Sequence, residues 1–213
     1  MLEAFYKTHD YLVEHVQVPA RRVLMDEINW NDRLIAIKGG RGVGKTDFLL
    51  NYLKEQRRIN PDASKRTLYV NFNDFYFTEH SLLEFVGQFV AAGGKTLIID
   101  QAFKYPNWSK EISQCFYRYP SLQIIFVASS VMRLIEDNHD IGNIVHSYNL
   151  RGFSFREYLN VTLGLKLPVY SLEDILKHHV EIAQKICQYV KPLQYFDTYL
   201  HHGYYPLFLE PHD

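Results

Sequence analysis

The chain has 213 residues, 47% of them hydrophobic, and its 23 lysines and arginines nearly balance its 24 aspartates and glutamates. This size suits one α/β domain with a small helical appendage, and the near-zero net charge excludes a global field that would recruit nucleic acid or an anionic membrane. The sequence predicts a soluble cytoplasmic protein with no membrane partner. Its two cysteines lack metal-ligand or redox spacing, Glu3 is acidic where a signal peptide is basic, and no apolar stretch approaches the roughly 20 residues of a spanning helix.

Two helices are predicted at the start of the chain. Residues 2–16 place apolar side chains at three- and four-residue steps, the pattern of an amphipathic helix, and Pro19 ends it. Residues 20–28 predict a shorter helix, and residues 29–32 predict the turn into the first strand. Arg21 and Arg22 could contact a nucleotide or a partner, but the solvated start of a helix is the favoured interpretation.

A glycine-rich motif follows an apolar run of strand length at residues 33–37 and precedes a segment of helical spacing at residues 47–53. Glycines let successive backbone N–H groups point inward, and the helix start adds partial positive charge, so this context predicts a phosphate-binding P-loop, or Walker A motif. Lys45 is expected to reach the β and γ phosphates and the Thr46 hydroxyl to bind Mg²⁺. A glycine-rich turn without a ligand is the alternative. The predicted nucleotide-binding residues are Gly39, Gly40, Arg41, Gly42, Val43, Gly44, Lys45, Thr46 and Asp47.

A second motif, which ends in an aspartate, follows the P-loop by some fifty residues. Residues 66–72 predict a strand and residues 81–92 a helix that ends at two glycines, and four apolar residues then lead to Asp100. A carboxylate at the carboxyl end of a strand beside a P-loop can hold Mg²⁺ or its waters, which is the Walker B pattern. The strand between the motifs indicates that they lie on non-adjacent strands, as in AAA- and RecA-like P-loop proteins.

The remaining elements continue the alternation of helix and strand. Residues 107–119 predict a helix, and residues 122–128 predict a buried strand with Ser129 and Ser130 at its end. A serine hydroxyl there could bind the γ-phosphate or the attacking water, or it could cap the helix expected at residues 131–137, and both interpretations stay open. Residues 145–150 predict a fifth strand, and Ser154 with Glu157 predicts a capping box at the start of a helix. Two further helices are predicted at residues 171–190 and 192–200.

The order of these motifs resembles prokaryotic AAA-type ATPases that often carry a second, C-terminal domain with nuclease-like character. The resembling segments are residues 38–46, 97–100, 104–108, 124–130, 150–159 and, beyond the core, 203–206. The resemblance implies an α/β fold of three layers, with a five-stranded parallel sheet between helices and a C-terminal helical lid. It also implies ATP or ADP and Mg²⁺ as cofactors, a P-loop domain at residues 1–165, and a helical lid or tail at residues 166–213.

Three positions depart from the family pattern. Gln101 stands where the family has the glutamate that polarises the attacking water, and an amide cannot accept a proton from that water. Asn143 and Ile144 stand where similar proteins have an arginine pair, although Arg133, Arg151 or an arginine of a neighbouring subunit could replace it. Asp47 follows Thr46 in place of a second hydroxyl residue, and its charge could weaken nucleotide affinity.

Three functions are compatible with the sequence. The favoured one is an AAA-type domain that binds Mg·ATP, hydrolyses it slowly or not at all, and uses it as a switch, with Lys45, Asp100, Gln101 and Ser129 around the phosphates. The second is an active ATPase in which Asp74, or less well Glu79, replaces Gln101. The third is a nucleotide-free module for protein interactions. Nucleotide is therefore the expected ligand, self-association or a protein partner is possible, and nucleic acid is not expected.

Overall fold

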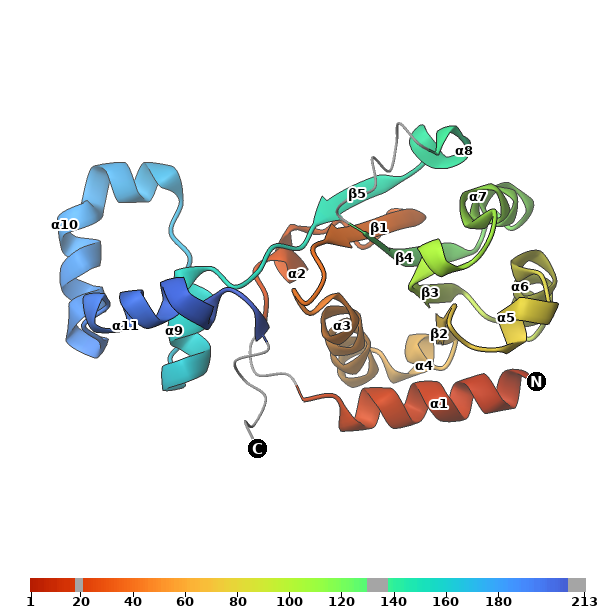
Figure 1. Ribbon diagram of the computed structural model, residues 1–213, viewed down its shortest axis with the longest axis horizontal. Coiled ribbons are helices and arrows are strands. Elements are labelled where there is room, and N and C mark those ends of the chain that lie inside the picture. Colours follow the sequence, from red (N-terminus) through yellow and green to blue (C-terminus); the bar gives the residue numbers. More distant parts are fainter. Residues whose placement is uncertain (18–20, 130–137, 207–213) are drawn as a thin grey trace. The chain divides into compact units, whose positions relative to one another are not determined.

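The computed structural model describes residues 1–17, 21–129 and 138–206. It divides the chain into two compact units, Met1–Leu150 and Arg151–Asp213 (Figure 1). The division falls fifteen residues before the boundary expected at residue 165 (165 minus 150), so the helix that begins after Ser154 belongs with the C-terminal helices.

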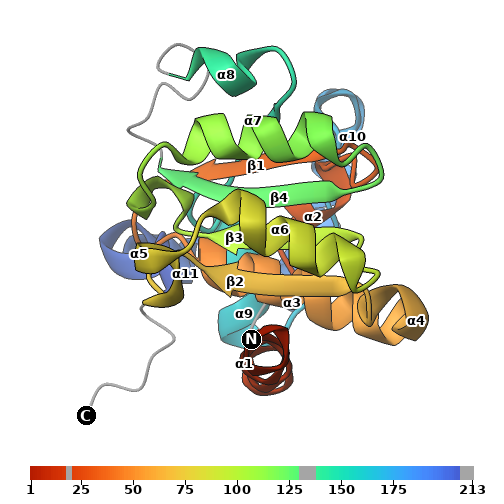
Figure 2. The same cartoon turned by 90° about the vertical axis from the view of Figure 1, so that its right-hand side faces the viewer.

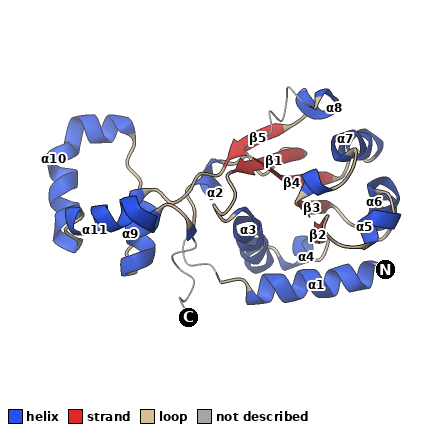
Figure 3. Cartoon of the chain, in the orientation of Figure 1, coloured by secondary structure: helices blue, strands red, loops and turns tan. Residues whose placement is uncertain are grey.

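Five strands of the first unit form one parallel sheet (Figure 3). They are β1 (Leu34–Gly39), β2 (Thr67–Asn71), β3 (Thr96–Asp100), β4 (Gln123–Ser129) and β5 (His146–Asn149), in the order β2-β3-β4-β1-β5. The expected non-adjacency of the two motif strands is confirmed, because β4 lies between β1 and β3. The strand that separates them in sequence, β2, lies at the edge of the sheet.

Helices cover both faces of this sheet. Figure 2 shows α6 (Leu82–Ala91) and α7 (Trp108–Arg118) lying across one face, while α3 (Lys45–Ile59) packs on the other together with α2 (Leu24–Glu27). Successive side chains of a strand point to opposite faces, so Leu34 and Ala36 of β1 join the α6–α7 core, and Ile35 and Ile37 join the α3 core. The expected three-layer α/β architecture is confirmed.

Helix α1 (Leu2–His15) lies along the open edge of β2. Phe5 of this helix belongs to one core and Val13 to the other. Between them His9, only 2% exposed, accepts a hydrogen bond through Nδ1 from the backbone N–H of Tyr69 at 3.0 Å. Unpaired N–H groups make an edge strand prone to non-native pairing, and His9 satisfies one of them. Burial is the main reason that the pKa of His9 falls to about 4, so its ring is neutral at pH 7.

Short turns connect these elements. The segment after α3 contains α4 (Pro61–Ser64), because the Asn60 side chain accepts the Ala63 N–H and Pro61 suits a first helical position. Other one-turn elements among the described residues of this unit include α5 (Tyr76–Glu79), η1 (Ala102–Lys104) and α8 (His139–Gly142).

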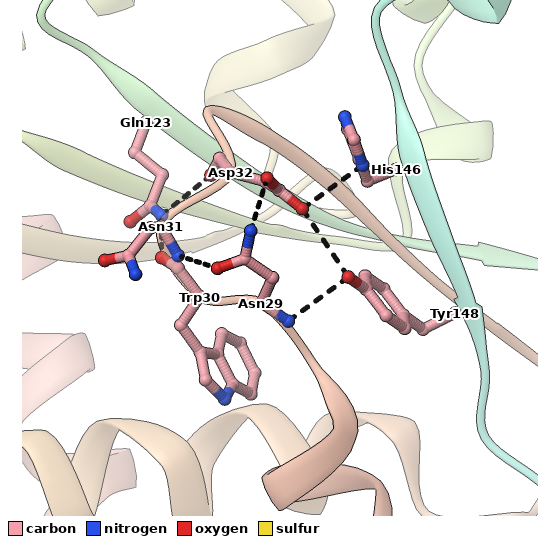
Figure 4. Close-up of polar contacts among 7 residues, drawn as sticks. All are labelled: Asn29, Trp30, Asn31, Asp32, Gln123, His146 and Tyr148. Atoms are coloured by element: carbon pink, nitrogen blue, oxygen red, sulfur yellow. Dashed lines mark hydrogen bonds and ion pairs between the residues drawn. The ribbon is translucent and has the colours of Figure 1, made fainter.

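A polar cluster fixes the turn at residues 29–32 to the amino ends of the strands (Figure 4). The Asp32 carboxylate accepts from Asn29 Nδ2 at 2.8 Å and lies 3.2 Å from Nδ1 of His146 on β5. From β4, Gln123 donates to the backbone oxygens of Trp30 and Asp32 at 2.6 and 2.9 Å. These contacts hold the start of β1 between its two neighbours, at the end of the sheet opposite the P-loop.

The second unit is helical in its described part. Its elements are α9 (Phe155–Leu163), α10 (Leu172–Tyr189), which is bent at His178, α11 (Leu193–Thr198) and the π-helical turn η2 (Tyr199–Gly203). The expected capping box of Ser154 and Glu157 is confirmed at the start of α9.

Two motifs of the second unit that are far apart in sequence contact each other. The Phe153 N–H donates to the Tyr204 carbonyl at 2.8 Å, and a Cβ on Gly152 would overlap that same carbonyl oxygen. The Tyr199 hydroxyl donates to the Phe153 carbonyl, and its ring packs on Phe155. These contacts explain why α9 groups with the C-terminal helices.

Candidate functional site

The glycine-rich motif forms the loop between β1 and α3. Gly42 and Gly44 have φ angles of 82° and 85°, in the left-handed region that glycine adopts without a steric penalty. A Cβ on Gly39 would overlap the backbone oxygen of Leu150, and the Leu150 N–H donates to the Lys38 carbonyl at 2.7 Å. The start of the loop is therefore held against the end of β5, and glycine is required there.

Lys45 is the first residue of α3, and its side chain turns back over the loop. Its ammonium donates to the carbonyl oxygens of Gly39 and Gly40 at 2.8 and 2.7 Å. Burial lowers the pKa of Lys45, and the negative charge of Asp100 opposes this effect. A phosphate group accepts stronger, charge-assisted hydrogen bonds than a neutral carbonyl does, so this half-buried cation suits a phosphate.

Thr46 and Asp100 meet beside this lysine. The Thr46 hydroxyl donates to Oδ2 of Asp100 at 2.7 Å, and Asp100 is only 1% exposed. A second donor to the same oxygen is the Tyr69 hydroxyl, at 2.8 Å. Burial and the Asp100 charge raise the pKa of Tyr69, so this hydroxyl stays protonated. The Thr46 hydroxyl and the Asp100 carboxylate are hard oxygen ligands, and Mg²⁺ binds through one or two such groups together with waters and phosphates.

The residue after Asp100 has an unusual backbone conformation. Gln101 has a φ of 54°, and its N–H donates to Oδ1 of Asp100 at 2.8 Å. Its side-chain oxygen accepts a hydrogen bond from Asn73 Nδ2 at 2.9 Å. The amide at this position is thus oriented by a neighbour that follows β2.

Arg22 contacts the loop from the segment before α2. It is 8% exposed and donates to the Val43 carbonyl at 3.2 Å. Arg21 forms exposed ion pairs with Asp26 and Glu55. The favoured interpretation, a solvated helix start, suits Arg21, but it is wrong for Arg22 because this guanidinium is buried against the P-loop.

The other predicted residues lie on several different elements of the first unit. Asp74 is exposed, and its carboxylate accepts the Tyr76 N–H at the start of α5. Asp47 is in the first turn of α3, close enough for its charge to raise the pKa of Tyr69. Asn143 follows α8. Ser129 ends β4, directly opposite Gly39 of β1, whereas Ser130, Arg133 and the helix expected at residues 131–137 lie outside the described residues.

Sequence reasoning missed three residues that support this site: Tyr69, Arg22 and Asn73. Their contacts with Asp100, Val43 and Gln101 join segments separated by 21 to 31 positions. Their only local signal was residue type, an aromatic in a strand or an arginine near a turn, and neither type specifies a contact with a phosphate loop.

A parallel sheet between helices, with this loop after β1 and the Asp100 carboxylate at the end of β3, defines a P-loop nucleotide-binding domain. Residues 31–159, more than half of the chain, match the family model described as AAA domain. The chain belongs to this family, which confirms the expected AAA-type P-loop fold. A comparison with curated proteins found no match.

Solved structures similar to this chain include PCH-2 from C. elegans, at 17% identity over 74% of this chain and 45% of that one, with a TM-score of 0.42. AMPPCP-bound DnaA from Aquifex aeolicus follows, at 16% identity over 83% and 63%, with a TM-score of 0.47. Aeropyrum pernix ORC1 in complex with DNA has 14% identity over 73% and 47%, with a TM-score of 0.45. The chain spans less than two thirds of each of these proteins. In the part of the chain that the structure describes, no helix has both the length and the apolar character needed to cross a bilayer.

Proposed function

We propose that this AAA-type domain binds Mg·ATP at the P-loop, hydrolyses it slowly or not at all, and acts as a nucleotide-dependent switch for a protein partner or a second copy of the chain. The observation that carries the proposal is that Lys45, Thr46 and Asp100 are assembled around one point while an amide, Gln101, follows the aspartate. The groups that bind are present, and the group that activates water is replaced.

The chemistry of the site supports binding over turnover. Lys45 and the N-terminus of α3 favour the phosphates, and Thr46 and Asp100 supply the two oxygens for Mg²⁺. Mg²⁺, when bound, would neutralise phosphate charge. The Gln101 side-chain oxygen can accept a hydrogen bond from water but not its proton, and general-base catalysis typically contributes about 10² to 10⁴ in rate.

The active-ATPase alternative gains no support from Asp74. Its carboxylate accepts the Tyr76 N–H two residues on, so it is engaged in an Asx turn of the backbone before α5.

Calorimetric titration of the chain with ATP and Mg²⁺ tests the binding half of the proposal, with Lys45→Ala as the variant and Lys54→Ala, an exposed lysine of the same helix, as the control. We expect saturable binding that Lys45→Ala weakens at least about tenfold, since a charge-assisted bond to phosphate contributes roughly 1.5–3 kcal/mol. Lys54→Ala should bind as the wild type does. Absence of binding to the wild type, or equal binding to all three proteins, would favour the nucleotide-free module.

A further inference from the structure

Asp100 receives hydrogen bonds on both of its carboxylate oxygens. Oδ1 accepts the Gln101 backbone N–H at 2.8 Å, and Oδ2 accepts the Thr46 hydroxyl at 2.7 Å and the Tyr69 hydroxyl at 2.8 Å. Thr46 and Gln101 are already part of the two nucleotide-binding motifs. Tyr69 is the additional donor, and it comes from a different strand.

Several contacts fix the position of Tyr69. It is 3% exposed in the core beneath α3, and in the parallel pairing of β2 with β3 it lies opposite Ile98, two residues before Asp100. Side chains two residues apart on a strand share a face, so the ring lies on the same side of the sheet as the carboxylate. Its backbone N–H is held by His9 of α1. The hydroxyl therefore reaches Asp100 from a side chain with little freedom to move.

We propose that Tyr69 is a positioning residue for the Mg²⁺-binding pair Thr46 and Asp100. A neutral hydroxyl orients the carboxylate without bringing a positive charge that would repel a cation. Groups that orient metal ligands in this way typically change metal affinity 10- to 100-fold when they are removed. The inference rests on the proposed function, because it concerns the metal-dependent part of nucleotide binding.

The test compares the full chain with Tyr69→Phe and with a matched control, Tyr52→Phe. Tyr52 is a residue of α3 whose side chain is buried in the same core as Tyr69, but among the described residues its hydroxyl has no hydrogen bond with Asp100 or Thr46. ATP dissociation constants are measured with excess Mg²⁺ and with EDTA, and their ratio gives the gain in affinity due to the metal. Electron paramagnetic resonance of Mn²⁺ bound with ADP gives a second readout that does not depend on turnover.

We expect Tyr69→Phe to reduce the gain due to the metal about tenfold, with affinity in EDTA within about twofold of the wild type. The bound Mn²⁺ signal should fall in parallel, and Tyr52→Phe should change neither quantity. In an Asp100→Asn background, Tyr69→Phe should have no further effect on the gain.

Other outcomes separate this inference from the proposed function. A wild type that binds no ATP under either condition contradicts the proposed function. A Tyr69→Phe chain that keeps the full gain contradicts the positioning role alone. A Tyr69→Phe chain that loses its fold, or loses affinity equally with Mg²⁺ and with EDTA, assigns Tyr69 a purely structural role and also overturns the inference.

Discussion

The backbone oxygen of Leu150 occupies the space where a Cβ on Gly39 would lie. Leu150 ends the first compact unit, and its N–H donates to the carbonyl of Lys38, the residue before this glycine. The P-loop therefore begins in direct backbone contact with the segment that follows β5. Gly40, the next residue, has a different environment, because a Cβ there would make an ordinary contact of 3.6 Å with Val43.

Because of this difference, we expect alanine to destabilise the chain at Gly39 but not at Gly40. Gly39→Ala should destabilise the ligand-free chain by about 1–3 kcal/mol, since a methyl group forces two backbone segments apart. Gly40→Ala should leave stability within about 0.5 kcal/mol, and urea unfolding of both variants without nucleotide measures this. Equal stabilities would mean that Leu150 moves away at little cost.

The buried contact of Arg22 with the P-loop is expected to contribute to both stability and ATP binding. Arg22→Met should destabilise the chain by about 2 kcal/mol, because the buried Val43 carbonyl loses a charged donor, and it should also weaken ATP binding by loosening the loop. Arg21→Met is the matched control, and its exposed pairs with Asp26 and Glu55 should contribute about 1 kcal/mol or less. Urea unfolding and ATP titration test both variants, and a larger effect at Arg21 would contradict the importance of the Val43 contact.

Because His9 is buried, we expect the free energy of unfolding to fall in mild acid. Its pKa is about 4 in the folded chain and about 6.5 in the unfolded chain, so the unfolded state binds more protons between these values. The contribution of His9 is complete above pH 6.5 and is lost as the pH falls towards 4, by about 3 kcal/mol in total (roughly 2.5 pKa units at 1.36 kcal/mol each).

Urea unfolding between pH 7 and pH 4 measures this loss. His9→Gln, whose side-chain oxygen can still accept the Tyr69 N–H, should remove most of the pH dependence in that window. His15→Gln, an exposed histidine on the same helix, should keep it. An unchanged slope in His9→Gln would show that other groups cause the acid sensitivity.

We expect a gain of ATP hydrolysis when the Gln101 amide beside Asp100 is replaced by a carboxylate. Gln101→Glu should raise the single-turnover rate of ATP hydrolysis by about 10²-fold, the low end of what a general base contributes. Asp74→Asn, measured in the same assay, should leave the rate unchanged, because this side chain forms an Asx turn before α5 and the asparagine oxygen can accept the same Tyr76 N–H. Loss of turnover in Asp74→Asn would favour the active-ATPase alternative.

Much of the fold could be predicted because its signals are local. The apolar runs that form β1, β3 and β4, the glycines between β1 and α3, and the Ser154–Glu157 capping box are short patterns with direct physical causes. The pairing of Thr46 with Asp100 followed from the two motifs together, since the carboxyl ends of parallel strands share one edge of a sheet.

The unpredicted features depend on contacts between distant segments. No local pattern in the sequence sets the register of β2 against β3, so the proximity of Tyr69 to Asp100 could not be derived from it. Arg22 looked like a surface residue because its partner is a backbone carbonyl 21 positions away. The grouping of α9 with the C-terminal helices depends on the packing of Phe155 on Phe196 and Tyr199, which no local pattern indicates.

A single-turnover experiment distinguishes ATP binding with little or no hydrolysis from turnover. Trace labelled ATP and Mg²⁺ are mixed with excess protein, Lys45→Ala serves as the control, and bound ATP and ADP are followed for hours. We expect the wild type to retain ATP that is not converted to ADP, whereas Lys45→Ala should retain none. Rapid conversion of bound ATP to ADP by the wild type would contradict this expectation.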